Sequence, residues 1–345
     1  MTLHCAFIGF GKSTTRYHLP YVLHRKDRWQ VAHIYRRRAK PEEQASQYSH
    51  IHFTSDLDEV LNDPLVKLVV VCTHADSHFE YAKKALEAGK NVLVEKPFTP
   101  TLEEAKTLFA LANSKGLTVT PYQNRRFDSC FLTTKKVIES GKLGELVEIE
   151  SHFDNYRPLA ETNPGGPQNG EFYGLGVHTL DQIISLFGRP DHVSYDLRSL
   201  RNKANPDDTF EAQLFYGDMK AIVKTSHLVQ IDYPKFIVHG HKGSFVKYGI
   251  DQQETSLKAN VMPGEPGFGA DDSVGELVYV NEAGEMVREA VPLESGDYGR
   301  VYDALYDTLV NGQPNYVKET DVLTNMEILQ RGFEQPSPAT ITLTR

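Results

Sequence analysis

The chain has 345 residues, of which 40% are hydrophobic and 24% charged, so it is long enough for two hydrophobic cores and has the composition of a globular protein. Its net charge of −9 argues against general nucleic-acid binding, and no apolar run is long enough to cross a bilayer. Three separated cysteines indicate reduced thiols, and a first strand starting near Leu3 leaves no room for a secretory signal. We therefore expect a cytoplasmic protein that binds neither nucleic acid nor a membrane.

Residues 1–122 alternate short apolar runs rich in β-branched residues with helical patterns, which predicts parallel strands joined by helices. Continuous apolar runs are typical of strands buried on both faces, so we expect an α/β domain with a doubly wound parallel sheet. A capping box of Thr101 and Glu104 predicts the start of one helix. The expected strands are Cys5–Ile8, Gln30–Tyr35, Lys67–Thr73, Asn91–Glu95 and Leu117–Thr120.

Residues 123–345 show a different pattern, in which apolar and polar residues alternate along the strands after a helix at Ser129–Ser140. Such alternation predicts a large, mostly antiparallel sheet with one buried face, and so an α+β domain. Glycine- and proline-rich surface loops are expected at Arg157–Gly170 and Met262–Asp272. Further strands are expected near residues 147–153, 193–198, 210–216, 220–226, 236–239 and 244–248, with closing helices near 298–310 and 320–332.

Gly9-Phe10-Gly11 lies between the first strand and a helix that is expected to begin near Ser13. This is the context of a dinucleotide-binding turn, in which one glycine makes the turn and another lets a pyrophosphate approach the backbone. The N–H groups of residues 12–15 would bind that pyrophosphate. Thr14 stands where the pattern has a third glycine, and its hydroxyl could bond a phosphate oxygen. The alternative is a tight turn without a ligand.

The end of the second strand bears on the choice of cofactor. At the place where an acidic residue would hold the ribose hydroxyls of NAD, the chain reads Tyr35-Arg36-Arg37-Arg38. Guanidinium groups suit a 2′-phosphate, which a carboxylate would repel. The sequence therefore favours NADP, with NAD as the alternative cofactor and a solvated basic turn as the alternative interpretation.

Two residues are candidates for catalysis. Lys96 follows the strand that ends at Glu95, where it could orient a substrate hydroxyl, although a solvated surface lysine is equally consistent with this stretch. His178 follows two glycines and could accept the hydroxyl proton, although Asp181 could simply satisfy it as a structural histidine.

A zinc site built from His74, His78, His152 and Asp154 is the alternative chemistry at these strand ends. Helix-capping residues at 76 and 77 would place His74 outside the helix, and no HExxH pattern is present. We therefore predict no metal. A GxSxG pattern is also absent, so the sequence gives no support to acyl transfer.

The segments GFGKSTTRYHLP, VVVCTHADSHFEYAKKALEAGKNVLVEKP, YQNRRFDSCF and GLGVHTLD resemble, in this order, the Gfo/Idh/MocA family of dehydrogenases. The resemblance spans the chain and implies a Rossmann domain, followed by an α+β domain whose sheet joins subunits into a homodimer or homotetramer. It also implies NAD(P)-dependent oxidation of a sugar, inositol or related polyol. Lys96 and His178 match the family's motif residues, while Arg126 matches an arginine between the domains.

One departure from the family concerns Gly174, because many members read D-x-G-x-H and this chain has glycine in place of the aspartate. Tyr173, Asp181 or Asp154 could replace it, or the protein could be an NADP(H)-binding sensor with weak or no catalysis. The expected cofactor residues are Gly9, Gly11, Lys12, Ser13, Thr14, Tyr35, Arg36, Arg37, Thr73, His74, His78, Glu95 and Lys96, and the expected substrate residues are Lys96, Arg126, Asp154, Tyr156, Tyr173 and His178.

Overall fold

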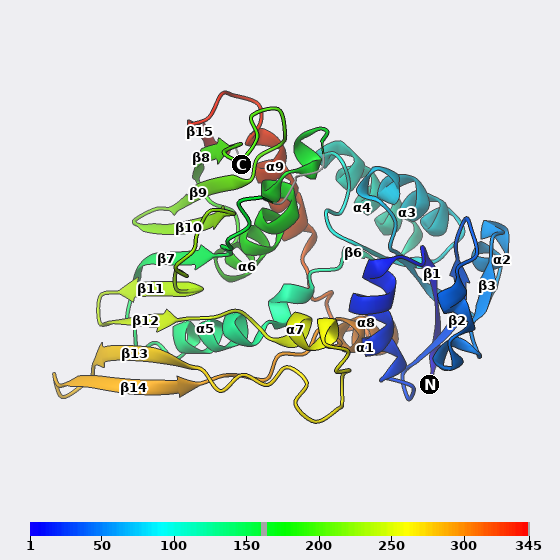
Figure 1. Ribbon diagram of the computed structural model, residues 1–345, viewed down its shortest axis with the longest axis horizontal. Coiled ribbons are helices and arrows are strands. Elements are labelled where there is room, and N and C mark those ends of the chain that lie inside the picture. Colours follow the sequence, from blue (N-terminus) through cyan, green and yellow to red (C-terminus); the bar gives the residue numbers. More distant parts are fainter. Residues whose placement is uncertain (160–163, 344–345) are drawn as a thin grey trace. The chain divides into compact units, whose positions relative to one another are not determined.

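The computed structural model describes residues 1–159 and 164–343, which form two compact units (Figure 1). The first unit comprises Met1–Asn124, Thr255–Phe268 and Tyr298–Glu319, and the second comprises Arg125–Glu254, Gly269–Asp297 and Thr320–Arg345. Two late segments of the chain thus belong with the N-terminal residues, whereas the sequence prediction kept each domain continuous.

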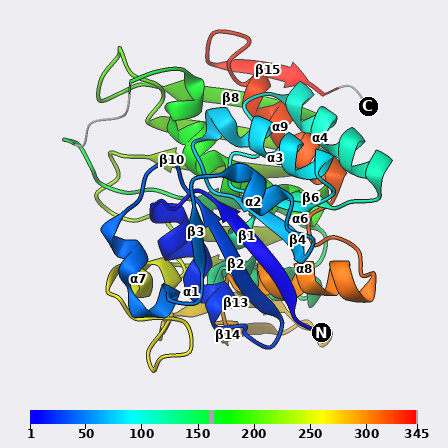
Figure 2. The same ribbon diagram turned by 90° about the vertical axis from the view of Figure 1, so that its right-hand side faces the viewer.

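A six-stranded parallel sheet forms the core of the first unit, in the order β3-β2-β1-β4-β5-β6. Its strands are β1 (Leu3–Ile8), β2 (Trp29–Tyr35), β3 (His52–Thr54), β4 (Val66–Val71), β5 (Asn91–Val94) and β6 (Val119–Pro121), and Figure 2 shows β1, β2 and β3 side by side. The predicted doubly wound sheet is confirmed. The strand order reverses between β1 and β4, the place where such sheets bind ligands beyond the carboxyl ends of their strands.

The helices of the first unit include α3 and α4, which lie side by side (Figures 1 and 2). The predicted capping box is present, because the Thr101 hydroxyl accepts from the Glu104 amide and the Glu104 carboxylate accepts from the Thr101 amide. The bounds are α1 (Leu19–Leu23), α2 (Leu57–Leu61), α3 (His78–Glu87), α4 (Leu102–Lys115) and α8 (Arg300–Asn311), while α7 (Gln253–Lys258) spans a boundary between the units.

A nine-stranded sheet forms the second unit, in the order β14-β13-β12-β11-β7-β10-β9-β8-β15. Only the β7–β10 pair is parallel among the pairs of this sheet in the described chain, so the prediction of a mostly antiparallel sheet is confirmed. The strands are β7 (Leu146–His152), β8 (His192–Arg198), β9 (Thr209–Tyr216), β10 (Met219–Ser226), β11 (Phe236–Gly240), β12 (Gly243–Lys247), β13 (Val274–Val280), β14 (Met286–Pro292) and β15 (Ala339–Thr342).

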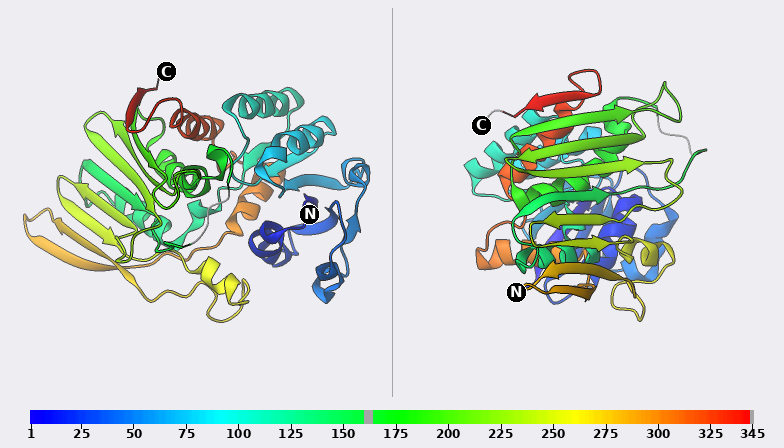
Figure 3. Two further views of the ribbon diagram at one scale, coloured as in Figure 1. Left: turned by 45° about the horizontal axis from the view of Figure 1, so that its top comes forward. Right: turned by 90° about the vertical axis from the view of Figure 1, so that its left-hand side faces the viewer.

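The two faces of this sheet differ. On one face, Ile149, Val223 and Phe236 are fully buried, and α5 (Ser129–Glu139), α6 (Val177–Phe187) and α9 (Glu319–Arg331) lie along it in Figure 1. The right panel of Figure 3 looks onto the other face, which no helix from the described residues of the second unit covers. Residues 160–163 of the expected loop lie outside the described residues. Nowhere in the described chain is a helix both long and apolar enough to span a membrane.

Candidate functional site

A cavity of about 650 Å³ lies in the first unit, where β1, β2 and β4 end. Five cationic residues line it, and the described residues around it include no aspartate or glutamate. The lining residues are Gly9, Phe10, Gly11, Lys12, Ser13, Tyr35, Arg36, Arg37, Arg38, Lys40, Cys72, Thr73, His74 and Tyr81. This excess of positive charge favours a ligand that carries several negative charges.

The two glycines of the turn after β1 have different roles. Gly9 has φ of 112°, and a Cβ there would lie 2.4 Å from the Cys72 carbonyl oxygen, so no other residue fits where β1 and β4 end together. A Cβ at Gly11 would meet nothing within 4 Å, so here the bare backbone faces the cavity. Helical conformation begins at Lys12, as expected, and includes a π-helical turn at Thr14–His18.

Thr14 does not lie on the cavity, contrary to the expectation that its hydroxyl binds a phosphate oxygen. Its side chain is fully buried, and its hydroxyl donates to the Gly9 carbonyl at 2.8 Å. Thr14 therefore stabilises the glycine turn from the side that faces away from the cavity. This explains how a threonine fits where the sequence pattern has a third glycine.

The basic segment after β2 faces the cavity with more residues than predicted, since Arg38 and Lys40 line it together with Arg36 and Arg37. Lys40 Nζ donates to the Phe10 carbonyl at 2.5 Å, which joins this segment to the glycine turn. The positive run itself was the sequence signal for these residues. Phe10, Cys72 and Tyr81 carried no such signal.

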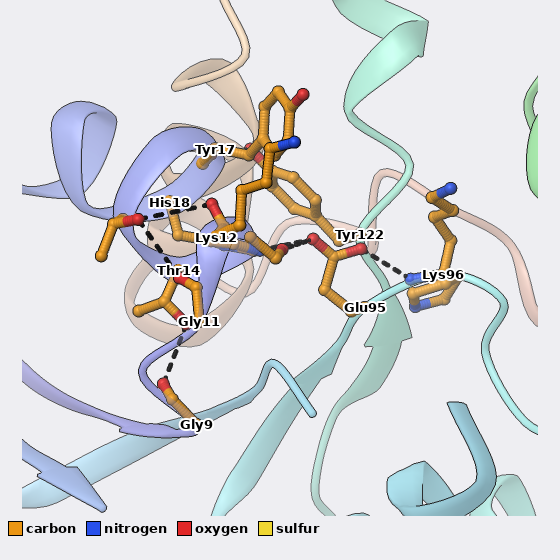
Figure 4. A network of polar contacts seen from close by, with 12 residues as sticks. Gly9, Gly11, Lys12, Thr14, Tyr17, His18, Glu95, Lys96 and Tyr122 are labelled. Carbon is orange, nitrogen blue, oxygen red and sulfur yellow. Dashed lines mark hydrogen bonds and ion pairs between the residues drawn. The ribbon is translucent and has the colours of Figure 1, made fainter. Parts of the chain in front are cut away.

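Glu95 is the centre of a buried polar network beside the cavity (Figure 4). Ser13, which lines the cavity, donates to Glu95 Oε1, and His18 Nε2 lies 3.1 Å from the same oxygen. Glu95 Oε2 accepts from the Lys96 amide at 2.9 Å. The other ring nitrogen of His18 lies 2.7 Å from the hydroxyl of Tyr302, on α8.

The Glu95 carboxyl is ionised in this network. Burial would raise its pKa, but the hydrogen bond and charge of His18, the Ser13 hydroxyl and the charge of Lys96 outweigh burial and lower the pKa to about 2. A fixed negative charge therefore lies directly behind the cavity wall. The sequence prediction included Glu95, Ser13 and Lys96 but missed His18 and Tyr302.

His78 was expected at the cofactor, but it does not line this cavity. It is buried, with its ring nitrogens 2.8 Å from the Pro97 carbonyl and 3.1 Å from the Thr73 carbonyl. Burial lowers the pKa of His78, against the effect of these carbonyls. The ring thus links the chain after β4 to the chain after β5, with both nitrogens in contact with backbone oxygens. In the described part of the chain, no group of three or more histidine, cysteine, aspartate or glutamate residues is placed so that it could hold a metal ion.

In the second unit, His178 is buried near the start of α6, which follows a π-helical turn at Phe172–Gly176. A Cβ at Gly174 would lie 3.2 Å from Glu171 Oε2, so the Glu171 carboxylate covers the glycine one turn before His178. Glu171 Oε1 lies 3.2 Å from His227 Nε2. Sequence reasoning considered other carboxylates and missed Glu171.

Arg126 is held by two acidic residues of its own unit. Its guanidinium donates to both oxygens of Asp181 at 2.8 Å and to Asp321 at 3.2 Å. Burial raises the pKa of Asp181, while Arg126 acts against that rise. The guanidinium therefore fixes α6 to α9 within the second unit.

The other expected substrate residues lie in different surroundings within the second unit. Tyr173 is buried, which raises its pKa to about 12, and its ring stacks on Phe333. Asp154 accepts from the Ser226 amide at 2.7 Å and lies 3.2 Å from His152. Tyr156, by contrast, is half exposed.

Comparison with known proteins identifies the fold family. Residues 3–123 match the NAD-binding Rossmann fold of the GFO_IDH_MocA oxidoreductase family, and residues 135–342 match the C-terminal alpha/beta domain of the same family. The chain belongs to the Gfo/Idh/MocA family. It is thus an oxidoreductase with an NAD-binding Rossmann domain, and the resemblance noted in its sequence is confirmed.

Individual relatives extend this result. The chain is 83% identical to the oxidoreductase YhhX of Escherichia coli (strain K12) over 100% of both chains. It matches a crystal structure of the oxidoreductase yhhX with a TM-score of 0.99 and 82% identity, covering 100% of both chains. It is also 32% identical to the scyllo-inositol 2-dehydrogenase (NADP(+)) IolW of Bacillus subtilis (strain 168), over 96% of this chain and 93% of that protein.

Proposed function

We propose that this chain is an NADP-preferring oxidoreductase that transfers hydride between the cofactor and a hydroxyl or carbonyl group of a polyol, such as an inositol or a sugar. The observation that carries the cofactor preference is the cavity after β1, β2 and β4, with its five cationic residues and no acidic one among the described residues that line it. IolW, a scyllo-inositol 2-dehydrogenase (NADP(+)) related over nearly the whole chain, supports both the cofactor and the polyol.

The cavity fits a dinucleotide at two positions. The bare backbone at Gly11 and the helix that starts at Lys12 suit a pyrophosphate, because unpaired N–H groups and positive charge meet there. Arg36, Arg37 and Arg38 suit the additional phosphate that distinguishes NADP from NAD. When bound, the nicotinamide ring supplies or accepts the hydride.

The proposed catalytic residues are Lys96 and His178. Lys96 polarises the reacting oxygen of the substrate, and its backbone is fixed by the ionised Glu95 carboxylate at 2.9 Å. His178 accepts the hydroxyl proton during oxidation, as an imidazole can near neutral pH. Arg126, Asp154, Tyr156 and Tyr173 remain proposals as substrate contacts.

The test begins with titration of the purified protein by NADPH and NADH, followed by turnover measurements over a panel of inositols and sugars. We expect tighter binding of NADPH and turnover of at least one polyol. Lys96→Ala and His178→Asn should lower kcat by about two orders of magnitude or more, whereas exposed Lys106→Ala should not. Wild-type rates in either variant would reject its catalytic role, and NADPH binding without turnover across the panel would favour a sensor.

We also propose that the chain forms a homodimer or homotetramer through the helix-free face of its nine-stranded sheet (Figure 3). Ile222 and Ile237 both pair with Glu150, and Ile237 pairs with Val246, so these four residues form one row across this face, and the three aliphatic members are half-buried. The alternate residues of these strands point to the opposite face of the sheet, where they are buried under helices. A second copy would cover the row.

A further inference from the structure

The guanidinium of Arg36 is held by a carboxylate outside the cavity. Arg36 Nε donates to Glu43 Oε1 at 2.7 Å and Nη2 donates to Glu43 Oε2 at 2.9 Å, which is the parallel pairing that a guanidinium makes with a carboxylate. Arg36 lines the cavity and Glu43 does not. The carboxylate therefore binds the guanidinium on the side away from the cavity, and the remaining N–H groups of Arg36 are available to a ligand.

Glu43 is itself fixed in place. Its side chain is only 6% exposed, and Oε1 also accepts from the Lys40 amide at 2.8 Å at the start of a 3₁₀ turn (Pro41–Gln44). The hydrogen bond from Arg36 lowers the pKa of Glu43 against the effect of burial, and the Lys40 amide adds to that lowering. The carboxylate is thus charged and joins Arg36 to the backbone of the following turn.

The same turn is anchored to the phosphate-binding loop. Lys40 Nζ donates to the Phe10 carbonyl at 2.5 Å and lies 5.9 Å from the centre of the Phe10 ring. The Phe10 ring makes edge contacts with Tyr48 at 5.8 Å and with Phe53 at 5.0 Å. The segment that carries Arg36 is therefore held at a fixed distance from the glycine turn, and Glu43 is the acidic member of that attachment.

We propose that Glu43 is a specificity-determining positioning residue, which presents Arg36 to the phosphate on the adenosine ribose of NADP. This inference rests on the proposed NADP preference and adds a residue outside the cavity to it. Arg36 orientation matters only when a phosphate is present. Replacing Glu43 should therefore affect the binding of an adenosine ligand that carries a 2′-phosphate and leave the binding of one without it nearly unchanged.

Whether replacing Glu43 weakens or tightens the binding of the 2′-phosphate distinguishes positioning of Arg36 from a simple effect of charge. By Coulomb's law alone, removing an acidic residue beside a cationic cavity should tighten the binding of an anion. Positioning predicts the opposite, because an Arg36 released from Glu43 must be ordered again by the ligand. Glu42 offers a matched control, since it is exposed and adjacent, and Glu42→Gln removes the same charge.

The experiment measures the affinity of the full chain for adenosine 2′,5′-bisphosphate and for adenosine 5′-monophosphate by calorimetry. Glu43→Ala should weaken bisphosphate binding by about tenfold, the loss expected for one charge-assisted hydrogen bond. Monophosphate binding should stay within about twofold, which also shows that the variant is folded. Glu43→Gln, whose amide oxygen still accepts from Arg36, should show a smaller loss.

Two results would overturn parts of this reasoning, and they are distinguishable. If the wild-type chain binds both adenosine ligands equally, the proposed NADP preference fails. If the wild type prefers the bisphosphate but the Glu43 variants bind it as tightly as the wild type or more tightly, the positioning role fails. Equal weakening by Glu42→Gln would also reject that role, because the loss would then not depend on the contact between Glu43 and Arg36.

Discussion

Replacing Glu95 by glutamine tests whether a buried negative charge stabilises the first unit. Glu95 is 8% exposed and receives hydrogen bonds on both oxygens, from Ser13 on one and from the Lys96 amide on the other. Glutamine has nearly the same shape but carries no charge and presents an amide group in place of one acceptor oxygen. The variant therefore loses the charge interaction with His18 as well as one acceptor.

The magnitude follows from the pKa of this carboxyl. A fall from 4.5 to about 2 on folding corresponds to about 3 kcal/mol of unfolding free energy at neutral pH. Because the pKa in the folded state is lower than in the unfolded state, the contribution is complete above pH 4.5 and is lost as the pH falls toward about 2. Glutamine has no carboxyl group to titrate, so Glu95→Gln should lack this contribution at every pH and should differ most from wild type above pH 4.5.

The chain contains a suitable reporter, because Trp29 is its single tryptophan. Trp29 is buried in the first unit and donates its indole N–H to the Tyr302 carbonyl at 3.1 Å, so its fluorescence reports unfolding next to the network. Urea unfolding should show Glu95→Gln to be about 3 kcal/mol less stable than wild type at neutral pH. The difference should shrink as the pH falls below 4.5.

Exposed Glu42→Gln is the control and should change stability by no more than about 0.5 kcal/mol. A glutamine variant as stable as wild type at neutral pH would refute the argument. So would a difference that stays constant as the pH falls well below 4.5, because the loss would then reflect shape or hydrogen bonding rather than charge.

Three further predictions concern the glycine turn, the histidine of the second unit and subunit contact. Gly9→Ala should lose about 2 kcal/mol or more of stability because its φ is 112°, while Gly11→Ala should lose little stability yet weaken NADPH binding, as thermal unfolding and titration would show. Glu171→Gln should lower kcat about tenfold and shift the pH profile of kcat. Adding Gly174→Asp to the Glu171→Ala variant should restore its activity. An unchanged pH profile in Glu171→Gln would contradict a role for this carboxylate. Ile237→Arg should reduce the native mass measured by light scattering, and an unchanged mass would place the contact elsewhere.

The sequence predicts most strands because apolar runs mark them directly. The expected Gln30–Tyr35 is β2 less its first residue, and the expected Asn91–Glu95 is β5 plus one residue. Strand β3 was missed because it has only three residues, one of them buried, and shows no alternation long enough to detect. The β13–β14 pair was also missed, since its segments mix charged and apolar residues.

The residues of the site could be predicted only where they belong to a pattern of neighbouring residues in the sequence. Gly9, Gly11 and the arginines after β2 lie in local patterns, and the structure brings them to one cavity. Tyr302 contacts His18 from 284 residues away, on a helix that belongs to the first unit, and no local pattern indicates such a contact. Hydrogen-bond partners of this kind depend on the tertiary fold.

Gly174 shows how a spacing pattern can mislead about chemistry. Read by position, the chain lacks a carboxylate four residues before His178, and this was the reason to consider a protein that binds its cofactor without turnover. The structure places the Glu171 carboxylate 3.2 Å from the point where a Cβ at residue 174 would lie. Because the glycine leaves that space open, a longer side chain from three residues earlier fills it. A carboxylate therefore lies beside residue 174 although the residue itself is glycine, in the turn that precedes α6.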